Sequence, residues 1–134
     1  MLLVHHKDAR ADFWVPPGGS LEGSESIFDC ARRETFEETG LTVEPVRLVY
    51  VEEFLDGPDY HFCKFWVLAQ KRAGSIVVSN NPAPAESIVE AAFVSKADLY
   101  EKKFFPSILK DEFWSDLESG FPSTKYLGLR NIEL

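Results

Sequence analysis

Three glutamates stand close together in the chain, at positions 34, 37 and 38. An α-helix turns by about 100° per residue, so these side chains fall within an arc of about 100° on one helix surface. Carboxylates at this spacing repel each other, and the negative end of the helix dipole disfavours them further. A sequence that breaks two local rules at one place indicates a functional site. A divalent cation held between the carboxylates would remove the repulsion.

The segments on either side of the glutamates predict how a helix would present them. The segment Phe13–Gly19 holds two prolines, which restrict the backbone, followed by two glycines, which release it. Ser24 and Ser26 are both candidate N-caps, and Gly40 is expected just after the last helical turn. The apolar residues of the N-terminal half share one side with Glu34, so this side should begin in the core and emerge at a cleft.

Further strands and helices follow from the spacing of apolar and turn residues. We expect strands at Met1–Val4, Val46–Phe54, Tyr60–Ala69, Ile76–Val78, Val89–Val94 and Tyr126–Leu129, charged or Pro/Asn loops at His5–Asp12 and Asn80–Ala85, a short helix opened by a capping box at Ser95–Asp98, and a second helix at Pro106–Leu117. Both alternating sets of side chains in Tyr60–Ala69 are largely apolar, which is typical of a strand covered on both faces. The pattern therefore predicts an α/β fold with helices on both sides of a sheet.

Length and composition limit the class of protein. The chain has 134 residues, 45% of them hydrophobic, which predicts one domain with one core over residues 1–134. The formal net charge of −8 argues against a general nucleic-acid or membrane-surface binder, although a bound metal can attract an anionic small molecule. Cys30 and Cys63 lie among apolar neighbours, and we expect both to be buried thiols. With no signal peptide and no apolar run of about 18 residues, a cytoplasmic protein without a membrane span is expected.

The segment 19–41 resembles the signature of the Nudix hydrolase family. Gly19 is followed after five residues by Glu25, and after seven more by Arg33-Glu34-Thr35-Phe36-Glu37-Glu38-Thr39-Gly40-Leu41. The one departure is Thr35, where the family more often has an aliphatic residue. The lead-in Trp14–Gly19 and the following Leu21-Glu22 are also similar to the family.

This resemblance implies a fold, a reaction and a cofactor. The fold would be an α/β/α sandwich with a mixed β-sheet between helices. Met1 already lies in the family's usual second strand, so either the true start is upstream or the sheet lacks the first strand. Nudix hydrolases cleave a nucleoside diphosphate linked to another group, with water attacking phosphorus. They use Mg²⁺ or Mn²⁺, hard cations that neutralise the diphosphate and lower the pKa of a bound water.

The resemblance also implies a role for each residue of the signature. Glu37 and Glu38 match the principal metal ligands, and Glu34 is either a further ligand or a base that orients water. The backbone carbonyl of Gly19 is the family's additional ligand. Arg33 would form an orienting ion pair to a nearby glutamate. The remaining position, Glu25, either ties the loop to the helix or supports the metal ligands.

A general base outside the signature is common in the family, and two later carboxylates are candidates for it. Glu86 follows the Asn80–Ala85 loop, and Glu90 lies in the next strand. Either could instead be a surface carboxylate. The general base is therefore Glu34, Glu86 or Glu90.

Several alternatives stay open at the level of sequence. The chain could be a nucleotide-sensing domain that has lost catalysis, or an isomerase or nucleotide-sugar hydrolase at the same metal site. Phe13 and Trp14 could stack on a base or act as a packing lid. The substrate pocket would take its aromatic residues from Tyr50, Phe54, Tyr60, Phe104, Phe105 and Trp114. Without the usual first strand, we expect an exposed sheet edge or a homodimer that covers it. The three histidines are too scattered for a metal cluster.

Overall fold

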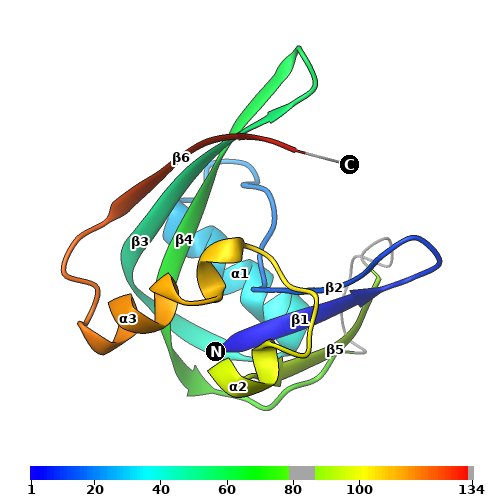
Figure 1. Cartoon of the computed structure of the whole chain (residues 1–134). Coiled ribbons are helices and arrows are strands. Elements are labelled where there is room, and N and C mark those ends of the chain that lie inside the picture. The colour runs from blue at the N-terminus through cyan, green and yellow to red at the C-terminus, as the bar shows by residue number, and fades with distance from the viewer. Residues whose placement is uncertain (79–86, 133–134) are drawn as a thin grey trace.

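The computed structural model describes residues 1–78 and 87–132. Its elements in chain order are β1 (Leu2–Lys7), β2 (Asp12–Val15), α1 (Ile27–Thr39), β3 (Thr42–Asp56), β4 (Tyr60–Ala73), β5 (Ile88–Phe93), α2 (Lys96–Leu99), the 3₁₀ helix η1 (Ser107–Leu109), α3 (Glu112–Glu118) and β6 (Lys125–Asn131). Strands and helices thus form a mixed α/β fold (Figure 1).

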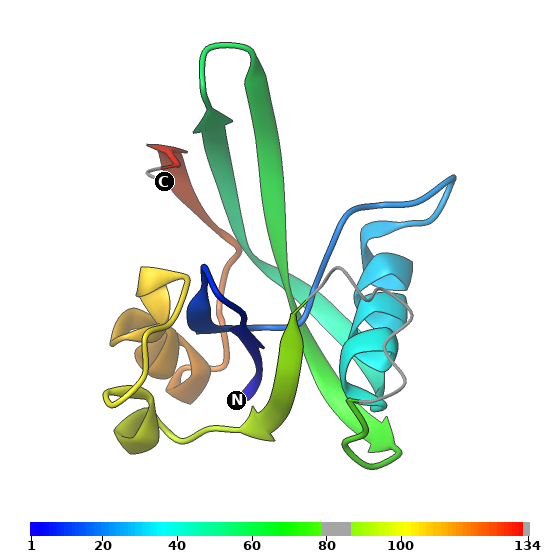
Figure 2. The same ribbon diagram turned by 90° about the vertical axis from the view of Figure 1, so that its right-hand side faces the viewer.

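The strands form two three-stranded sheets. One has the order β2-β1-β5, and both of its pairings are antiparallel. The other has the order β4-β3-β6, in which β3 pairs antiparallel with β4 and parallel with β6. Figure 2 shows α1 on one side of the long β3–β4 hairpin and α2, η1 and α3 on the other, with the hairpin turn projecting beyond them.

Helix α1 begins and ends where its local sequence predicts. Ser26 is the N-cap, and its Oγ accepts a hydrogen bond of 3.0 Å from the backbone N–H of Asp29. Gly40 has a φ of 77°, and its N–H donates to the carbonyl of Phe36 at 2.8 Å. This left-handed conformation favours glycine, so the residue ends the helix and turns the chain into β3.

The main core lies where the two sheets meet η1 and the segment before β6. Its buried members share an apolar or aromatic side chain: Leu3, Trp14, Val49, Tyr50, Val94, Leu99, Ile108, Leu109 and Phe121. They come from strands and helices that are far apart in sequence. The core therefore fixes β2, and with it the Gly18–Gly19 turn that follows, against the rest of the domain.

The predicted α/β class is confirmed, with two corrections to the sheets. The strands divide into two sheets of three rather than one mixed sheet. Strand β4 is not covered on both faces, because each of its residues is exposed or half-buried. Cys63 on β4 is accordingly exposed, whereas Cys30 is buried as expected. Strand β4 is an edge strand of the described chain, and the homodimer that would cover an edge stays a prediction.

Other predicted elements differ in extent. Residues 76–78 form no strand, although the Val77 N–H donates to the Thr39 carbonyl at 2.9 Å. The expected loop from His5 is wrong at both ends, because β1 runs to Lys7 and β2 begins at Asp12. The helix expected over Pro106–Leu117 divides into η1 and α3. The loop Asn80–Ala85 lies outside the described residues.

Candidate active site

Glu38 is buried at the C-terminal end of α1, beside the turn that follows β2. The residue is 2% exposed. The backbone N–H of Gly18 donates to both carboxylate oxygens of Glu38, at 3.1 Å to Oε2 and 3.3 Å to Oε1. A hydrogen bond to a buried carboxylate is among the stronger ones in proteins. It holds the glycine turn against the last turn of the helix.

Glu34 lies one helical turn earlier and packs against the next glycine. It is 7% exposed. A Cβ added to Gly19 would stand only 2.6 Å from Glu34 Cδ and 2.8 Å from Oε2, closer than real Cβ contacts. Position 19 therefore needs glycine because the Glu34 carboxyl occupies the space that a side chain would take. The two residues expected to share a cation lie side by side.

Arg33 is the cationic centre of the site. Its Nη2 donates to Glu25 Oε1 at 2.7 Å, its Nε to Glu25 Oε2 at 3.1 Å, and its Nη1 to Glu34 at 2.9 Å and Glu37 at 3.2 Å. The guanidinium also donates to the Ser20 carbonyl at 3.0 Å. Arg33 thus donates hydrogen bonds to three glutamates rather than one, and its orienting role in catalysis stays a prediction.

Glu25 ties the loop to the helix. The Glu22 N–H donates to its Oε1 at 2.8 Å, while Arg33 holds both of its oxygens. The hydrogen bonds from Arg33 are the largest cause of a Glu25 pKa lowered to about 2, and the Glu25 carboxylate in turn raises the pKa of Arg33. These contacts favour the structural alternative for Glu25.

The donor set of the site fits a hard divalent cation. Glu34, Glu37 and Glu38 carry carboxylate oxygens, and Gly19 packs against the Glu34 carboxyl; oxygen ligands of this kind are what Mg²⁺ and Mn²⁺ prefer. Within residues 1–78 and 87–132, no three His, Cys, Asp or Glu side chains already converge as a metal cluster. Glu37 points to Arg33 instead.

Of the two candidate bases outside α1, the structure describes only Glu90. Glu86 lies outside the described residues. Glu90 is on β5, with its side chain 57% exposed and Oε2 3.9 Å from His5 Nδ1. In the described part of the chain, this ion pair links β1 and β5, and a role for Glu90 as the general base stays a prediction.

Trp14 is a packing residue, which decides one of the open alternatives. It is 7% exposed. The His5 ring stacks on it with centroids 4.5 Å apart and planes 9° apart, and the Lys102 ammonium lies 4.5 Å from the ring centroid. With neighbours on its ring, Trp14 anchors β2 below the glycine turn.

One buried carboxylate was not predicted from the sequence. Glu52 on β3 is fully buried, its Oε2 accepts a hydrogen bond of 2.8 Å from Trp66 Nε1, and its Oε1 lies 3.1 Å from Arg130 Nη2. Alternate residues of a strand lie on the same face, so Glu52 shares a face with Tyr50 and Phe54. This alternation could have placed Glu52 on the inward face of β3.

Comparison with known proteins identifies the family. The model of the NUDIX domain matches residues 1–112, so the chain belongs to the Nudix family. The human 8-oxo-dGDP phosphatase NUDT18 is 37% identical over 99 residues, which cover 74% of this chain and 29% of that protein. The m7GpppN-mRNA hydrolase NUDT17 of Danio rerio is 53% identical over 48 residues, or 34% of this chain and 16% of that protein. The chain thus spans less than a third of the length of these relatives.

Solved structures confirm the fold. The Nudix hydrolase from Nitrosomonas europaea superimposes with a TM-score of 0.73 at 19% identity, over 98% of this chain and 71% of that one. The MutT protein from Bacillus halodurans gives a TM-score of 0.66 at 23% identity, over 96% and 80% of the two chains. Within the described ranges, every helix is too short or too polar to cross a membrane.

Proposed function

We propose that this chain is a metal-dependent hydrolase of a nucleoside diphosphate linked to another group. The observation that carries the proposal is the contact of α1 with the glycine turn, where two buried carboxylates, Glu34 and Glu38, lie against Gly18 and Gly19. Burying carboxylates is costly unless positive charge or hydrogen bonds compensate them. Arg33 pairs with Glu34, and a divalent cation would add positive charge among the carboxylates.

Each residue has a proposed task. Glu37 and Glu38 hold the cation, the Gly19 carbonyl adds an oxygen ligand, and Glu34 either completes the ligand set or orients the attacking water. Arg33 keeps Glu34 and Glu37 in place. When bound, Mg²⁺ or Mn²⁺ would neutralise the diphosphate and lower the pKa of a coordinated water. The general base is Glu34, Glu86 or Glu90.

The substrate class follows from the family rather than from one relative. Similar proteins are named as an 8-oxo-dGDP phosphatase, an m7GpppN-mRNA hydrolase and an ADP-ribose pyrophosphatase. All three names describe a nucleotide diphosphate or a longer phosphate chain. We therefore propose a small nucleoside-diphosphate derivative as the partner of a single Nudix domain over residues 1–134.

A substrate panel tests this function. The purified chain is incubated with MgCl₂, MnCl₂ or EDTA and with nucleoside triphosphates, 8-oxo-dGDP, dinucleotides, ADP-ribose and nucleotide sugars, and products are separated by ion-exchange chromatography. We expect turnover of at least one compound with metal and none with EDTA. If no compound is turned over and one is bound tightly, the chain is a nucleotide sensor rather than a hydrolase.

A matched pair of variants ties turnover to the site. Glu38→Gln preserves the size of the side chain and an oxygen that can accept from Gly18, but removes the negative charge. Glu101→Gln makes the same chemical change at an exposed position after α2. We expect turnover to be abolished in the first variant and unchanged in the second, with both folded by circular dichroism.

A further inference from the structure

The last turn of α1 packs against the short segment that follows β4, residues 74–77. Figure 2 shows the end of β4 beside the end of α1. The Val77 N–H donates to the carbonyl of Thr39 at 2.9 Å. Thr39 is fully buried and directly follows Glu38 in the helix. A backbone hydrogen bond from outside the helix therefore holds the residue next to the more deeply buried glutamate of the candidate site.

Gly40 and Gly74 pack so closely that neither position has room for a side chain. A Cβ added to Gly74 would stand 2.6 Å from the carbonyl oxygen of Gly40, and a Cβ added to Gly40 would stand 2.8 Å from the carbonyl oxygen of Ser75. Both of the atoms met are backbone atoms, which cannot turn aside as the end of a flexible side chain can. A side chain at position 74 would therefore push the segment 74–77 and the end of α1 apart.

The end of α1 is also held by the glycine turn that follows β2. The Gly18 N–H donates to both carboxylate oxygens of Glu38. Thr39 moves with the helix, because its hydroxyl donates to the Thr35 carbonyl at 2.6 Å. A displacement of Thr39 would therefore move the adjacent Glu38 relative to Gly18.

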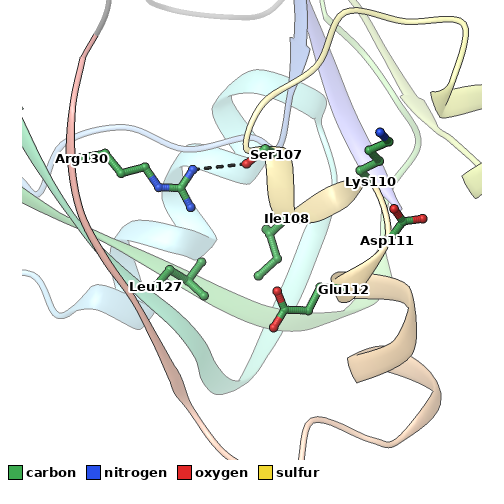
Figure 3. Close-up of a pocket in the computed structure, with 7 residues that line it drawn as sticks. All are labelled: Ser107, Ile108, Lys110, Asp111, Glu112, Leu127 and Arg130. Carbon is green, nitrogen blue, oxygen red and sulfur yellow. Dashed lines mark hydrogen bonds between the residues drawn. The ribbon is translucent and has the colours of Figure 1, made fainter.

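The segment 74–77 differs in this respect from the cavity lined by η1, α3 and β6. At one wall of that cavity Arg130 Nη1 donates to Ser107 Oγ at 3.2 Å (Figure 3). Figure 2 shows the β3–β4 hairpin between these elements and α1. The segment 74–77, by contrast, contacts the helix that carries the glutamates, so it is placed to act on the candidate active site.

We propose that Gly74 is a positioning residue for the metal ligands of α1, an inference that rests on the function proposed above. Its lack of a side chain lets the segment 74–77 close on the last turn of α1. The segment acts through the backbone of Thr39 and Gly40 and so keeps the Glu38 carboxylate at the glycine turn. Gly74 lies outside the segment 19–41 that carries the Nudix signature.

Gly74→Ala and Gly128→Ala form a matched pair of variants. Gly128 has a φ of 97°, close to the 91° of Gly74, so alanine meets a similar conformational cost at both positions. In the described part of the chain, a Cβ added to Gly128 has no atom within 4 Å. A difference between the two variants therefore reports the contact with Gly40 rather than backbone strain.

Mn²⁺ titrations followed by electron paramagnetic resonance measure the effect on the site. We expect Gly74→Ala to bind Mn²⁺ roughly tenfold more weakly than the wild type, which is the size of effect typical of residues that orient metal ligands. Gly128→Ala should bind within about twofold of the wild type, and circular dichroism checks that both variants are folded. Equal affinities of the two folded variants would overturn the proposal, because strain alone lowers stability without separating them in Mn²⁺ affinity.

Val77→Pro decides the question if Gly74→Ala does not fold. The change removes the N–H that donates to Thr39, while position 74 keeps its glycine. It should also weaken Mn²⁺ binding relative to Gly128→Ala. Wild-type Mn²⁺ affinity in a folded Val77→Pro variant would overturn the proposal.

Metal-free NMR separates this inference from the proposed function. In ¹H–¹⁵N spectra of the full chain, we expect Gly74→Ala to shift the backbone signals of Gly18 and Glu38, and Gly128→Ala to leave them in place. If Gly74→Ala shifts neither signal, Gly74 does not position Glu38, even where the wild type binds metal and hydrolyses the panel. If both signals shift and the wild type binds no Mn²⁺, the positioning of Glu38 stands and the metal-dependent function alone fails.

Discussion

Gly19 and Glu34 are packed so closely that the carboxyl group of one occupies the side-chain position of the other. An added Cβ would stand 2.6 Å from Glu34 Cδ. Position 18, one residue earlier, has no atom within 4 Å of an added Cβ. A side chain would therefore clash with Glu34 at position 19 but meet open space at position 18, and substitutions at the two glycines can be compared directly.

Gly19→Ala should displace the Glu34 carboxyl from the glycine turn. Because the end of a glutamate side chain is flexible, we expect the fold to persist while metal-dependent turnover falls at least tenfold. Gly18→Ala keeps the N–H that donates to Glu38 and meets open space, so its turnover should stay within about twofold of the wild type. Equal activities of the two variants in a steady-state assay would show that the Gly19–Glu34 contact is unimportant.

The Glu25–Arg33 pair should make stability depend on acidic pH. The pKa of Glu25 is lowered from 4.5 to about 2 in the folded chain, chiefly by hydrogen bonds from Arg33. A carboxyl pKa that is lowered on folding stabilises the folded chain at pH values above the ordinary pKa of 4.5. This stabilisation is lost as the pH falls from about 4.5 to about 2.

Urea denaturation at a series of pH values measures this loss. Glu25→Gln should be less stable than the wild type at pH 7, and the difference in unfolding free energy should shrink below pH 4.5. Glu101→Gln is the exposed control. A difference between Glu25→Gln and wild type that is constant from pH 7 to pH 2 would contradict the ion pair.

A hydrogen bond from Tyr50 to Asp116 should stabilise the packing of α3 on β3. The Tyr50 hydroxyl donates to Asp116 Oδ2 at 2.6 Å, both residues are buried, and burial is the main cause of a raised Tyr50 pKa. Tyr50→Phe should lower the unfolding free energy by about 1.5–3 kcal/mol, the range for hydrogen bonds to charged groups.

Tyr100→Phe is the matched control for this change. The Tyr100 hydroxyl also donates to an aspartate, Asp111, at 3.1 Å, but on the surface. Its removal should change stability by less than about 0.5 kcal/mol. Similar losses in the two variants, measured by urea denaturation, would mean that burial does not strengthen the Tyr50 contact.

The identity of the general base can be read from paired substitutions. Glu86→Gln and Glu90→Gln each remove one candidate, and general acid–base help is typically worth about 10²–10⁴-fold in rate. We expect the Glu90 variant to lose less than tenfold in kcat, because its exposed carboxylate already faces His5. A loss below tenfold in both variants would assign the base to Glu34, and a larger loss in Glu90→Gln would refute this expectation.

Local signals in the sequence were sufficient for α1 and its caps. Ser26 and Gly40 act within four residues of themselves, so their roles do not depend on the rest of the fold. The capping box at Ser95 likewise predicts α2. The helix expected over Pro106–Leu117 is instead two short helices. Ile108 and Leu109 of η1 pack in the core, whereas Asp116 of α3 accepts a hydrogen bond from Tyr50, and these two long-range contacts cannot be seen in the local sequence.

Long-range relationships could not be obtained in the same way. The apolar content of β4 indicated burial on both faces, but Phe65 is exposed and Trp66 packs against the core, because no layer covers the outer face in the described chain. The spacing of the glutamates predicted a shared helix surface. It could not predict that Glu52 would be buried against Arg130, since that pair depends on chain segments brought together by folding.

Binding of Mn²⁺ followed by electron paramagnetic resonance tests the central claim most directly, because the signal of the free ion decreases as the protein takes it up. Titrations of the wild type, Glu38→Gln and Glu101→Gln separate the α1 site from the surface carboxylates. We predict that Glu38→Gln binds Mn²⁺ at least tenfold more weakly than the wild type, with Glu101→Gln unchanged. Equal binding by all three proteins would contradict a cation held by the glutamates of α1.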